Sequence, residues 1–564
     1  MAKIEYRSRG NLEVLVDFYD DLLFAHAPFY PEDIDRLFVR LAKDGIKTVS
    51  WYYQSDERGG WVNRFLPSPG APERSRFAVY DECCVMRRAC EAAHKHNIRF
   101  IIGFKPYETG FFGLDLKTAR AQNINTVEQL GRMIAAIDPF VVEHPELRLR
   151  LRPELRNVDP MPRIGRIELW KADDAPTRIK KENLEILVSN VNLEYSKLNV
   201  PFDFSEEIRT NAADETDLFG KVISRKGQKV RVLTLNGLDF RSRYWAVQCV
   251  GLEGPGDFLG LGNRMMRVYD VHGNPVDGCF ARKYSICDKE CTDLEGHGAY
   301  FDIGYGQREY TLDDPGEYTA FTAQLSEYVT GSLCETEPAV QRFWLDCVDS
   351  ILDAGVDGVE FRIENHGHMT DHSLDYGFND AVLELAGKDA SDESIAKVRG
   401  DGFTDFLQKA VDRIRARGKV SRLYVSIDRL TEPLPADRLL AWPQNIEYQW
   451  ERWLEEGLAD EVVFRVFNFV LCQTALQNPL TDRVAEKCRQ HHVPMVFSFY
   501  VRDLSNPWYI EEAERIILDE RFAGLVLYEN SSLLELAEDH SWRGKPHADG
   551  YLKRIEEFAR AIRE

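Results

Sequence analysis

The chain has 564 residues, of which 44% are hydrophobic and 29% are charged, and its formal net charge is −22. This hydrophobic content is enough for a large buried core and excludes an intrinsically disordered chain. The strong negative charge repels phosphate backbones and anionic lipid, so nucleic acid and membrane surfaces are not expected as partners. No run of residues approaches the 18 or so apolar residues of a membrane span, and no transmembrane helix is expected.

The cysteines and the N-terminal residues bear on the compartment. The chain contains 11 cysteines without regular spacing, and MAKIEYRSRG at the start has positive charge but no apolar segment. An odd number of scattered cysteines favours free thiols in a reducing compartment. We therefore expect a cytoplasmic protein, and the alternative is a secreted protein whose signal peptide has been removed.

Short apolar segments that end in polar residues alternate with amphipathic helices in the first part of the chain. This alternation is typical of parallel βα units. The predicted strands span Leu12–Asp21, Ile46–Gln54 and Ile98–Pro106, and the predicted helices between them span Pro31–Asp44 and Tyr80–His96.

The alternation stops after the third predicted strand. The segment Thr126–Leu151 has a helical pattern, whereas from about Ile164 to Val276 the hydrophobic period changes to two. Short alternating segments with turn residues between them predict a β-sandwich-like domain inserted after the third strand. We therefore divide the chain into a first barrel part (1–111), an insertion (112–335, β-rich around 164–276) and a second barrel part (336–564).

Five more predicted strands follow the insertion. They span Asp357–Asn365, Arg422–Asp428, Glu461–Asn468, Pro494–Val501 and Ala523–Asn530, with helices predicted at Pro338–Ala354, Gly402–Arg417 and Ala548–Ile562. Eight βα units in one chain predict an α/β fold of the (β/α)8 TIM-barrel type. A doubly wound open sheet is the alternative, and the lack of a G-x-G-x-x-G motif after the first strand weakens its dinucleotide-binding form.

The fourth predicted strand has charged residues on one of its two faces. Active sites of such barrels lie at the C-terminal ends of the strands, and alternate residues of a strand point to opposite faces. Val359, Phe361 and Ile363 would face the helices, while Glu360, Arg362 and Glu364 would face the barrel axis. Buried charges are costly unless they are paired or used, so the choice is between a structural Arg–Glu network and catalysis. We expect Glu364 to be catalytic because it lies at the catalytic end of the strand.

Two carboxylates on either side of one glycosidic bond are the minimum for glycoside hydrolysis. Asp428 ends the fifth predicted strand and Glu529 ends the eighth, so either residue could pair with Glu364. Arg362 beside Glu364 would keep that acid ionised, as a nucleophile requires. The first predicted strand offers Asp17 and Asp20 at the same end of the barrel.

Further polar and aromatic residues end strands at this predicted face. Aromatic rings pack on the apolar faces of pyranose rings, and polar groups bind their hydroxyls. Besides Arg362, the predicted substrate contacts are Trp51, Tyr53, Lys105, Asn365, His366, His368, Asn468 and Tyr500.

The loop after the fourth strand is rich in histidine. His366, His368 and His372 lie close together in NHGHMTDHSLDYGFND, and imidazoles are common ligands of divalent ions. We expect no cofactor, and this loop is the predicted place for a divalent metal if the protein uses one.

The sequence around the fourth strand resembles a known group of proteins. DAGVDGVEFRIENHG, then DYGFNDAVLELAGKD and VRGDGFTDFLQKAV, resemble bacterial glycosyl-hydrolase-like TIM-barrel proteins. The opening YPEDIDRLFVRLAKDGIKTVSWYY is similar to the first βα unit of that group. The resemblance implies a TIM barrel with glycosidase-like activity.

A weaker likeness extends to the alpha-amylase superfamily, whose fourth strand reads R-x-D-x-x-x-H with the Asp as nucleophile. Arg362, Glu364 and His368 have the same spacing, with Glu in place of Asp. That superfamily also inserts a domain after its third strand. Its fifth strand ends in a Glu acid/base, whereas this one ends in Asp428.

Three functions are consistent with these features. The leading hypothesis is a glycoside hydrolase that cleaves a glycosidic bond in an oligosaccharide or glycoside. The alternatives are a metal-dependent sugar isomerase, epimerase or lyase that uses the histidine-rich loop, and a non-catalytic glycan-binding barrel. In each case carbohydrate is the expected partner, and a homo-oligomer is compatible with the sequence.

Overall fold

The fold is taken from a computed structural model of the chain. It describes residues 9–53, 67–115, 126–130, 133–156, 162–171, 173–189, 196–216, 222–242, 244–249, 264–276, 318–322, 327–363, 373–387, 389–426, 445–466, 474–501 and 504–564. None of the helices within these ranges combines the length and apolar character needed to cross a bilayer.

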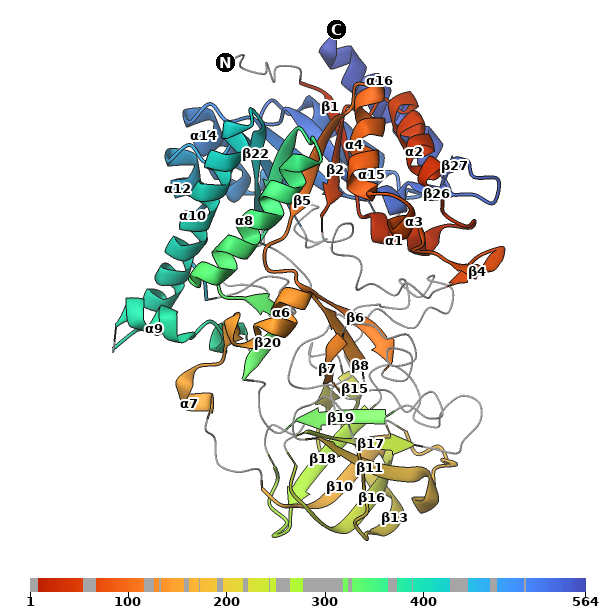
Figure 1. Ribbon diagram of the computed structural model, residues 1–564. Helices are drawn as coiled ribbons and strands as arrows, with labels where there is room; N and C mark the ends of the chain where they lie inside the picture. The colour runs from red at the N-terminus through yellow and green to blue at the C-terminus, as the bar shows by residue number, and fades with distance from the viewer. Residues whose placement is uncertain are drawn as a thin grey trace.

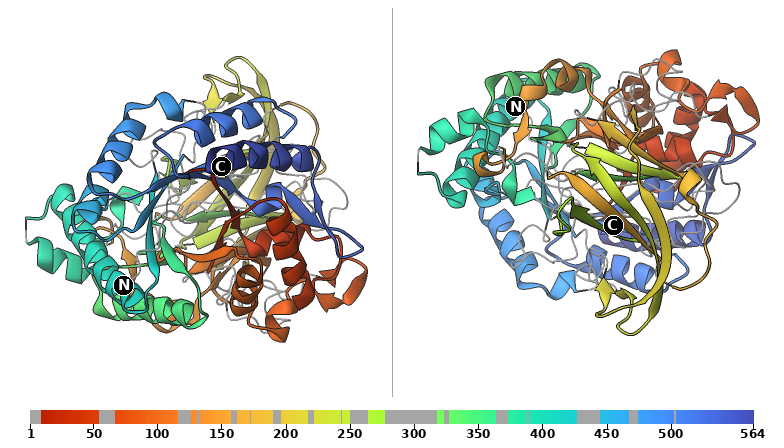
Figure 2. Two further views of the ribbon diagram at one scale, coloured as in Figure 1. Left: turned by 90° about the horizontal axis from the view of Figure 1, so that it is seen from above. Right: turned by 90° about the horizontal axis from the view of Figure 1, so that it is seen from below.

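A closed barrel of parallel strands forms the upper part of the molecule in Figure 1 and is viewed from above in the left panel of Figure 2. The predicted (β/α)8 fold is therefore confirmed. In their order around the barrel, the strands are β1 (Asn11–Val16), β2 (Thr48–Tyr52), β5 (Arg99–Phe104), β21 (Gly358–Phe361), β22 (Val420–Ser426), β23 (Glu461–Arg465), β24 (Met495–Tyr500) and β25 (Gly524–Tyr528).

Helices surround this barrel, as both panels of Figure 2 show. The longer ones are α2 (Pro31–Lys43), α4 (Val85–Lys95), α8 (Pro338–Asp353), α10 (Asp392–Ala416), α14 (Pro479–Gln490), α15 (Trp508–Leu518) and α16 (Ala548–Arg563). Shorter helices are α1 (Phe18–Phe24), α3 (Val79–Glu82), α9 (Asp380–Ala386) and α12 (Trp450–Glu455), and small hairpins pair β3 (Pro67–Ser68) with β4 (Ala71–Ser75) and β26 (Leu534–Leu536) with β27 (Trp542–Gly544).

The two faces of each barrel strand have different roles, as the period of two predicts. On β21, the side chains of Val359 and Phe361, together with Ile363 just beyond the strand, belong to the large core between the barrel and its helices. A second cluster fills the barrel interior and contains Leu15, Tyr52, Tyr424, Val463, Val496, Val526 and Tyr528. Gly103 on β5 makes room for this interior, because a Cβ atom there would lie 2.8 Å from Cδ1 of Tyr52.

The barrel interior on the N-terminal side of this aromatic layer contains a buried charge network. Arg422 is completely buried and forms ion pairs of 2.9 Å with Glu13, 2.8 Å with Glu461 and 3.8 Å with Glu360. Arg99 makes a further ion pair of 3.2 Å with Glu461. Glu360 therefore belongs to the structural network that the sequence allowed as an alternative, in a part of the barrel away from the strand ends.

The insertion leaves the barrel after β5 and returns through α8, so it joins the barrel at the C-terminal ends of the strands. Figure 1 shows its strands below the barrel. Nearest the barrel are a three-stranded sheet of β6 (Gly110–Asp115), β8 (Met133–Ile137) and β7 (Thr126–Leu130), the short helices α6 (Pro139–Glu143) and α7 (Pro153–Arg156), and a pair formed by β20 (Tyr328–Leu333) and β9 (Arg148–Arg150).

Two four-stranded antiparallel sheets form the sandwich at the far end of the insertion. One contains β13 (Asp203–Thr210), β16 (Lys229–Phe240), β10 (Ile164–Lys171) and β18 (Arg264–Asp270), and the other contains β12 (Ser196–Leu198), β11 (Leu184–Ser189), β17 (Tyr244–Cys249) and β19 (Tyr318–Thr322). A short pair of β14 (Glu215–Thr216) and β15 (Val222–Ser224) lies beside them. Ile167, Leu235, Trp245 and Val247 are among the buried residues of the separate sandwich core.

A buried network holds the point where the insertion rejoins the barrel. Arg399 on α10 donates from Nε to Glu335, just before α8, at 2.6 Å. Tyr107, just after β5, donates from its hydroxyl to the same carboxylate at 2.9 Å. The buried hydrogen bond thus joins the exit of the chain to its return, and the buried ion pair joins the return to α10.

Some predicted elements are wrong in type or extent. Within the described residues, the segment predicted to be helical at Thr126–Leu151 contains the strands β7, β8 and β9, together with α6 and a short turn of helix. The first strand ends at Val16 rather than Asp21, because α1 begins at Phe18. The helix predicted at Gly402–Arg417 begins ten residues earlier, at Asp392, where the Ser391 hydroxyl caps it.

Candidate functional site

Three carboxyl groups meet where the barrel closes between its last and first strands. Glu529 follows β25, Asp17 follows β1, and Asp20 lies in the first turn of α1. One oxygen from each of the three carboxyls lies within 4.8 Å of the others. Because β1 pairs in parallel with β25, both chain segments reach this point at the same C-terminal edge of the barrel.

The surroundings of Asp20 and Glu529 favour the neutral forms of these two carboxyls. Loss of hydration raises the pKa of Glu529 above its usual range, and the charge of Asp17 adds to that effect. The pKa of Asp20 is raised well above its usual range by loss of hydration and by the charge of Glu529. Like charges at short distance and poor solvation both disfavour ionisation. The cluster can therefore hold a proton at a pH where an exposed carboxyl has lost its own.

Neighbouring side chains support Glu529 and the segment that follows it. The hydroxyl of Ser531 donates a hydrogen bond of 3.0 Å to Glu529, which favours the ionised carboxylate. Asn530 donates a bond of 2.9 Å from its side-chain amide to Asp21. The pKa of Asp21 is raised well above its usual range, because burial outweighs the hydrogen bond from Asn530.

Cations and tyrosines lie in the barrel interior at the same end. The Lys105 ammonium is buried 4.0 Å from the ring centre of Tyr52 and forms an ion pair of 2.9 Å with Glu108. Arg362 and Arg465 are also buried, with guanidinium groups 4.9 Å from the ring of Tyr424 and 4.0 Å from the ring of Tyr528, respectively. Burial alone would lower the pKa of Lys105, but the negative charges of Glu108 and Asp17 outweigh it and raise the pKa.

Several predicted site residues are placed at this mouth. Glu529 is in the carboxyl cluster, and Lys105 and Arg362 are in the cationic layer beside it. Tyr500 stacks on Tyr528 with ring centres 5.0 Å apart. The remaining predicted polar residues, Glu364, Asn365, His366, His368, His372, Asp428 and Asn468, lie outside the described residues, and their roles stay predictions.

Two predicted substrate contacts lie in the core instead. Trp51 is fully buried and stacks on Phe18 at 4.9 Å, on the face of β2 that packs against the helices. Tyr53 is nearly as buried and packs edge-on against Phe104. The alternation of β2 sends Tyr52, rather than Trp51 or Tyr53, into the barrel interior. This placement corrects the prediction that Trp51 and Tyr53 lie at the mouth.

Asp17 and Asp20 are the residues that sequence reasoning noticed but left without a role. Strands 1 and 8 of a closed barrel are neighbours, so acids after strand 1 must lie near an acid that ends strand 8. The neighbourhood of strands 1 and 8 in a closed barrel is therefore the sequence signal that identifies this cluster. The three carboxyls also offer oxygen ligands of the kind that Mg²⁺ and Mn²⁺ prefer, and are thus a second candidate metal site besides the histidine loop.

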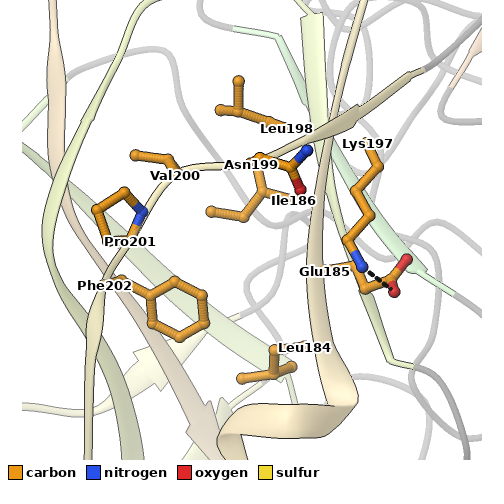
Figure 3. Close-up of a pocket in the computed structure, with 9 residues that line it drawn as sticks. All are labelled: Leu184, Glu185, Ile186, Lys197, Leu198, Asn199, Val200, Pro201 and Phe202. Carbon is orange, nitrogen blue, oxygen red and sulfur yellow. Dashed lines mark hydrogen bonds and ion pairs between the residues drawn. The ribbon is translucent and has the colours of Figure 1, made fainter.

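A separate groove lies on the inserted sandwich, away from the barrel strands. It has a volume of about 350 Å³ and runs between β11 and the segment that follows β12 (Figure 3). Apolar side chains including Ile186, Val200 and Phe202 line it, and Lys197 crosses one side in an ion pair of 2.5 Å with Glu185. Among the described residues that line the groove, Glu185 is the one carboxyl, so they offer no pair of carboxyls for hydrolysis.

No protein-family model and no curated protein matches the sequence. Among solved structures, the chain is similar to the catalytic domain of a beta-amylase from Paenibacillus polymyxa (6% identity, 97% of this chain and 98% of that chain covered, TM-score 0.37). It is also similar to a maltogenic alpha-amylase from Thermotoga neapolitana (8% identity, 98% and 77% covered, TM-score 0.33). A third is an exo-beta-N-acetylglucosaminidase from Vibrio harveyi (10% identity, 99% and 59% covered, TM-score 0.32).

Proposed function

We propose that this protein is a glycoside hydrolase in which Glu529 supplies one of the two catalytic carboxyl functions. The observation that carries the proposal is the cluster of Asp17, Asp20 and Glu529 at the C-terminal end of the barrel, with oxygens within 4.8 Å of one another. A carboxyl with a raised pKa keeps its proton to higher pH than an exposed carboxyl does, which suits a general acid for a glycosidic oxygen.

The groups around the cluster suit a sugar. Tyr500 and Tyr528 present aromatic rings at the same end of the barrel, and aromatic rings pack on the apolar faces of pyranoses. Tyr52 is fully buried, and its hydroxyl has no hydrogen-bond partner among the described residues. A donor of this kind can bind a sugar hydroxyl.

The second catalytic carboxylate is proposed to be Glu364 or Asp428. These residues follow β21 and β22, which lie across the barrel from β25 in the strand order. That arrangement would place a sugar between the two carboxyl functions. A separation of about 5–5.5 Å would give retention of configuration and about 6.5–9.5 Å inversion.

The test is the E529Q variant on a panel of oligosaccharides and aryl glycosides. We expect turnover to fall by roughly 10³-fold or more while circular dichroism stays unchanged, because a glutamine side chain cannot transfer a proton as an acid. E520Q is the matched control, since the side chain of Glu520 is 90% exposed. Activity of folded E529Q near the wild-type level would contradict the assignment.

Chelation separates hydrolysis from the metal-dependent isomerase, epimerase or lyase that the sequence left open. A hydrolase that uses carboxyl groups alone retains its activity after treatment with EDTA. Loss of activity with EDTA, restored by Mg²⁺ or Mn²⁺, would favour the metal-dependent enzyme, with the same three carboxyls as ligands.

A further inference from the structure

The charged side chains at the mouth of the barrel are divided between two sides. Asp17 and Glu529 follow β1 and β25, which pair with each other. The cations Lys105, Arg362 and Arg465 lie at the ends of β5, β21 and β23, and none of these three strands pairs with β1 or β25. A ligand at the mouth therefore meets carboxyls on one side and positive charge across from them.

The three cations form one continuous layer with the tyrosine rings of the barrel interior. Lys105, Arg362 and Arg465 are 2%, 4% and 1% exposed, respectively. The charged groups of Lys105 and Arg362 lie 4.0 and 5.3 Å from the ring centre of Tyr52. Those of Arg362 and Arg465 lie 5.7 and 4.0 Å from the ring centre of Tyr528. Like charges that are close together and poorly hydrated repel one another, so this layer attracts negative charge.

The hydroxyl of Tyr52 is an independent indication of a ligand at this layer. Tyr52 is completely buried, and its hydroxyl has no hydrogen-bond partner among the described residues. A buried hydroxyl without a partner is costly, and such groups are rare in folded proteins. A negatively charged ligand oxygen that accepts a hydrogen bond from this hydroxyl, and lies against the neighbouring cations, satisfies both kinds of group.

We propose that the substrate is an acidic glycoside, and that the acidic group on its sugar ring is bound by Arg362, Arg465 and the hydroxyl of Tyr52. This inference rests on the proposed glycosidase function. Glu108 forms an ion pair of 2.9 Å with Lys105, so the acidic group is assigned to the two arginines, whose planar guanidinium groups match a carboxylate or a sulfate. The charges also orient the sugar, with its acidic group toward the arginines and its glycosidic bond toward the carboxyls across the barrel.

Equilibrium binding to the wild-type protein tests the proposal without any turnover. Glucuronate and galacturonate are titrated by calorimetry, beside glucose and galactose as neutral sugars with the same rings, and beside the 6-sulfates of these two sugars. We expect the uronates or the 6-sulfates to bind roughly 10-fold or more tightly than the neutral sugars, because a hydrogen bond to a charged group contributes about this factor. The class that binds identifies the acidic group as a carboxylate or a sulfate. If neither class binds more tightly than the neutral sugars, the proposal is overturned.

Two variants locate the acidic group at the cation layer. Y52F keeps the ring and removes the hydroxyl, so its unfolding midpoint should not fall, while its affinity for the acidic sugar should fall roughly 10-fold. R465M should lose roughly 10- to 100-fold in the same affinity. R543M is the matched control, because the side chain of Arg543 is 59% exposed. Wild-type affinity in folded Y52F and R465M would mean that the layer only stabilises the barrel, and Y52F decides alone if R465M does not fold.

Hydrolysis of matched aryl glycosides separates this inference from the glycosidase function. Aryl glycosides of the acidic sugar should be cleaved with kcat/KM roughly 10²-fold or more above that of the neutral glycosides, because a site built for a charged group rejects a sugar that lacks it. Cleavage of neutral glycosides at the same kcat/KM would contradict the acidic substrate and leave the glycosidase function standing. Tight binding of acidic sugars without cleavage of any glycoside would support the anion site and contradict the glycosidase function.

Discussion

Asn530 donates a hydrogen bond of 2.9 Å from its side-chain amide to the carboxylate of Asp21, and both side chains are buried. The bond joins the segment after the last barrel strand to helix α1. Asp21 follows Asp20 in the sequence, and Asn530 follows Glu529. One hydrogen bond thus holds together the two segments that carry the candidate catalytic carboxyls.

Replacement of Asn530 by alanine should destabilise the protein and misplace the carboxyls. The N530A variant leaves an oxygen of Asp21 without its donor in a buried position, at a cost of roughly 1–3 kcal/mol in the free energy of unfolding. Urea unfolding curves measure this cost. N530D should be less stable still, because it places a second acid against Asp21. A stability of N530A equal to that of wild-type protein would contradict the role of this bond.

The barrel could be predicted from the sequence because its strands have a clear period of two. Val359 and Phe361 were expected to face the helices and Arg362 the axis, and the structure agrees. The strands around β8 could not be recognised, because the short apolar run Met133–Ile137 fits a helix as well as a strand. The pairing of β8 with β6 and β7 is what makes this run a strand rather than a helix.

The candidate site was predicted less completely than the fold. The sequence pattern places Asp17 and Asp20 in a long first strand, and their meeting with Glu529 depends on barrel closure, which joins residues about 500 positions apart. Because Trp51 lies near the end of its strand, the sequence predicts that its side chain lies at the C-terminal mouth of the barrel. The alternation of β2, with Ser50 and Tyr52 toward the axis, places Trp51 on the helix side. The alternation of side chains along β21 predicted its two faces correctly. The same alternation along β2 predicts that Trp51 faces the helices.

The R422M variant should be strongly destabilised. Arg422 is the central cation for Glu13, Glu360 and Glu461, and its removal leaves buried carboxylates without a partner. The loss of one member of a buried ion pair costs roughly 3–5 kcal/mol. R417M is the control, because the side chain of Arg417 is 40% exposed and its ion pairs should contribute roughly 0–1 kcal/mol. Thermal or urea unfolding compares the two, and equal losses would contradict a structural role for the network.

Glu13 should make the protein less stable as pH rises from about 4.5 to about 7. Burial raises its pKa in the folded protein from 4.5 to about 7. Within this window the folded state binds more protons than the unfolded state, so the free energy of unfolding falls with increasing pH, by up to about 1.4 kcal/mol per pH unit. Below the window both states are protonated, and above it both are ionised. E13Q removes this titration, so its unfolding midpoints should depend less on pH; an unchanged slope would exclude Glu13 as the source.

G103A should disturb the aromatic layer of the barrel interior. The added Cβ would lie 2.8 Å from Cδ1 of Tyr52, so the ring beneath Lys105 must shift. Overpacking of this kind costs roughly 1–3 kcal/mol. G550A in α16 is the matched control, because no atom lies within 4 Å of its added Cβ and alanine favours the helix by roughly 0.5–1 kcal/mol. Opposite shifts in the unfolding midpoints are expected, and a neutral effect of G103A would contradict close packing against Tyr52.

S531A should move the alkaline limit of activity to higher pH. The Ser531 hydroxyl donates to Glu529 at 3.0 Å and stabilises the ionised carboxylate. Its removal raises the pKa of Glu529, so Glu529 keeps its proton to higher pH, and the fall of kcat with rising pH shifts in the same direction. S532A is the control, because Ser532 bonds to Glu529 through its backbone amide. The pH profiles of kcat for the two variants make the comparison. If the alkaline limb of the pH profile stays in place in S531A, or moves equally in S532A, the Ser531 hydroxyl does not set the pKa of Glu529.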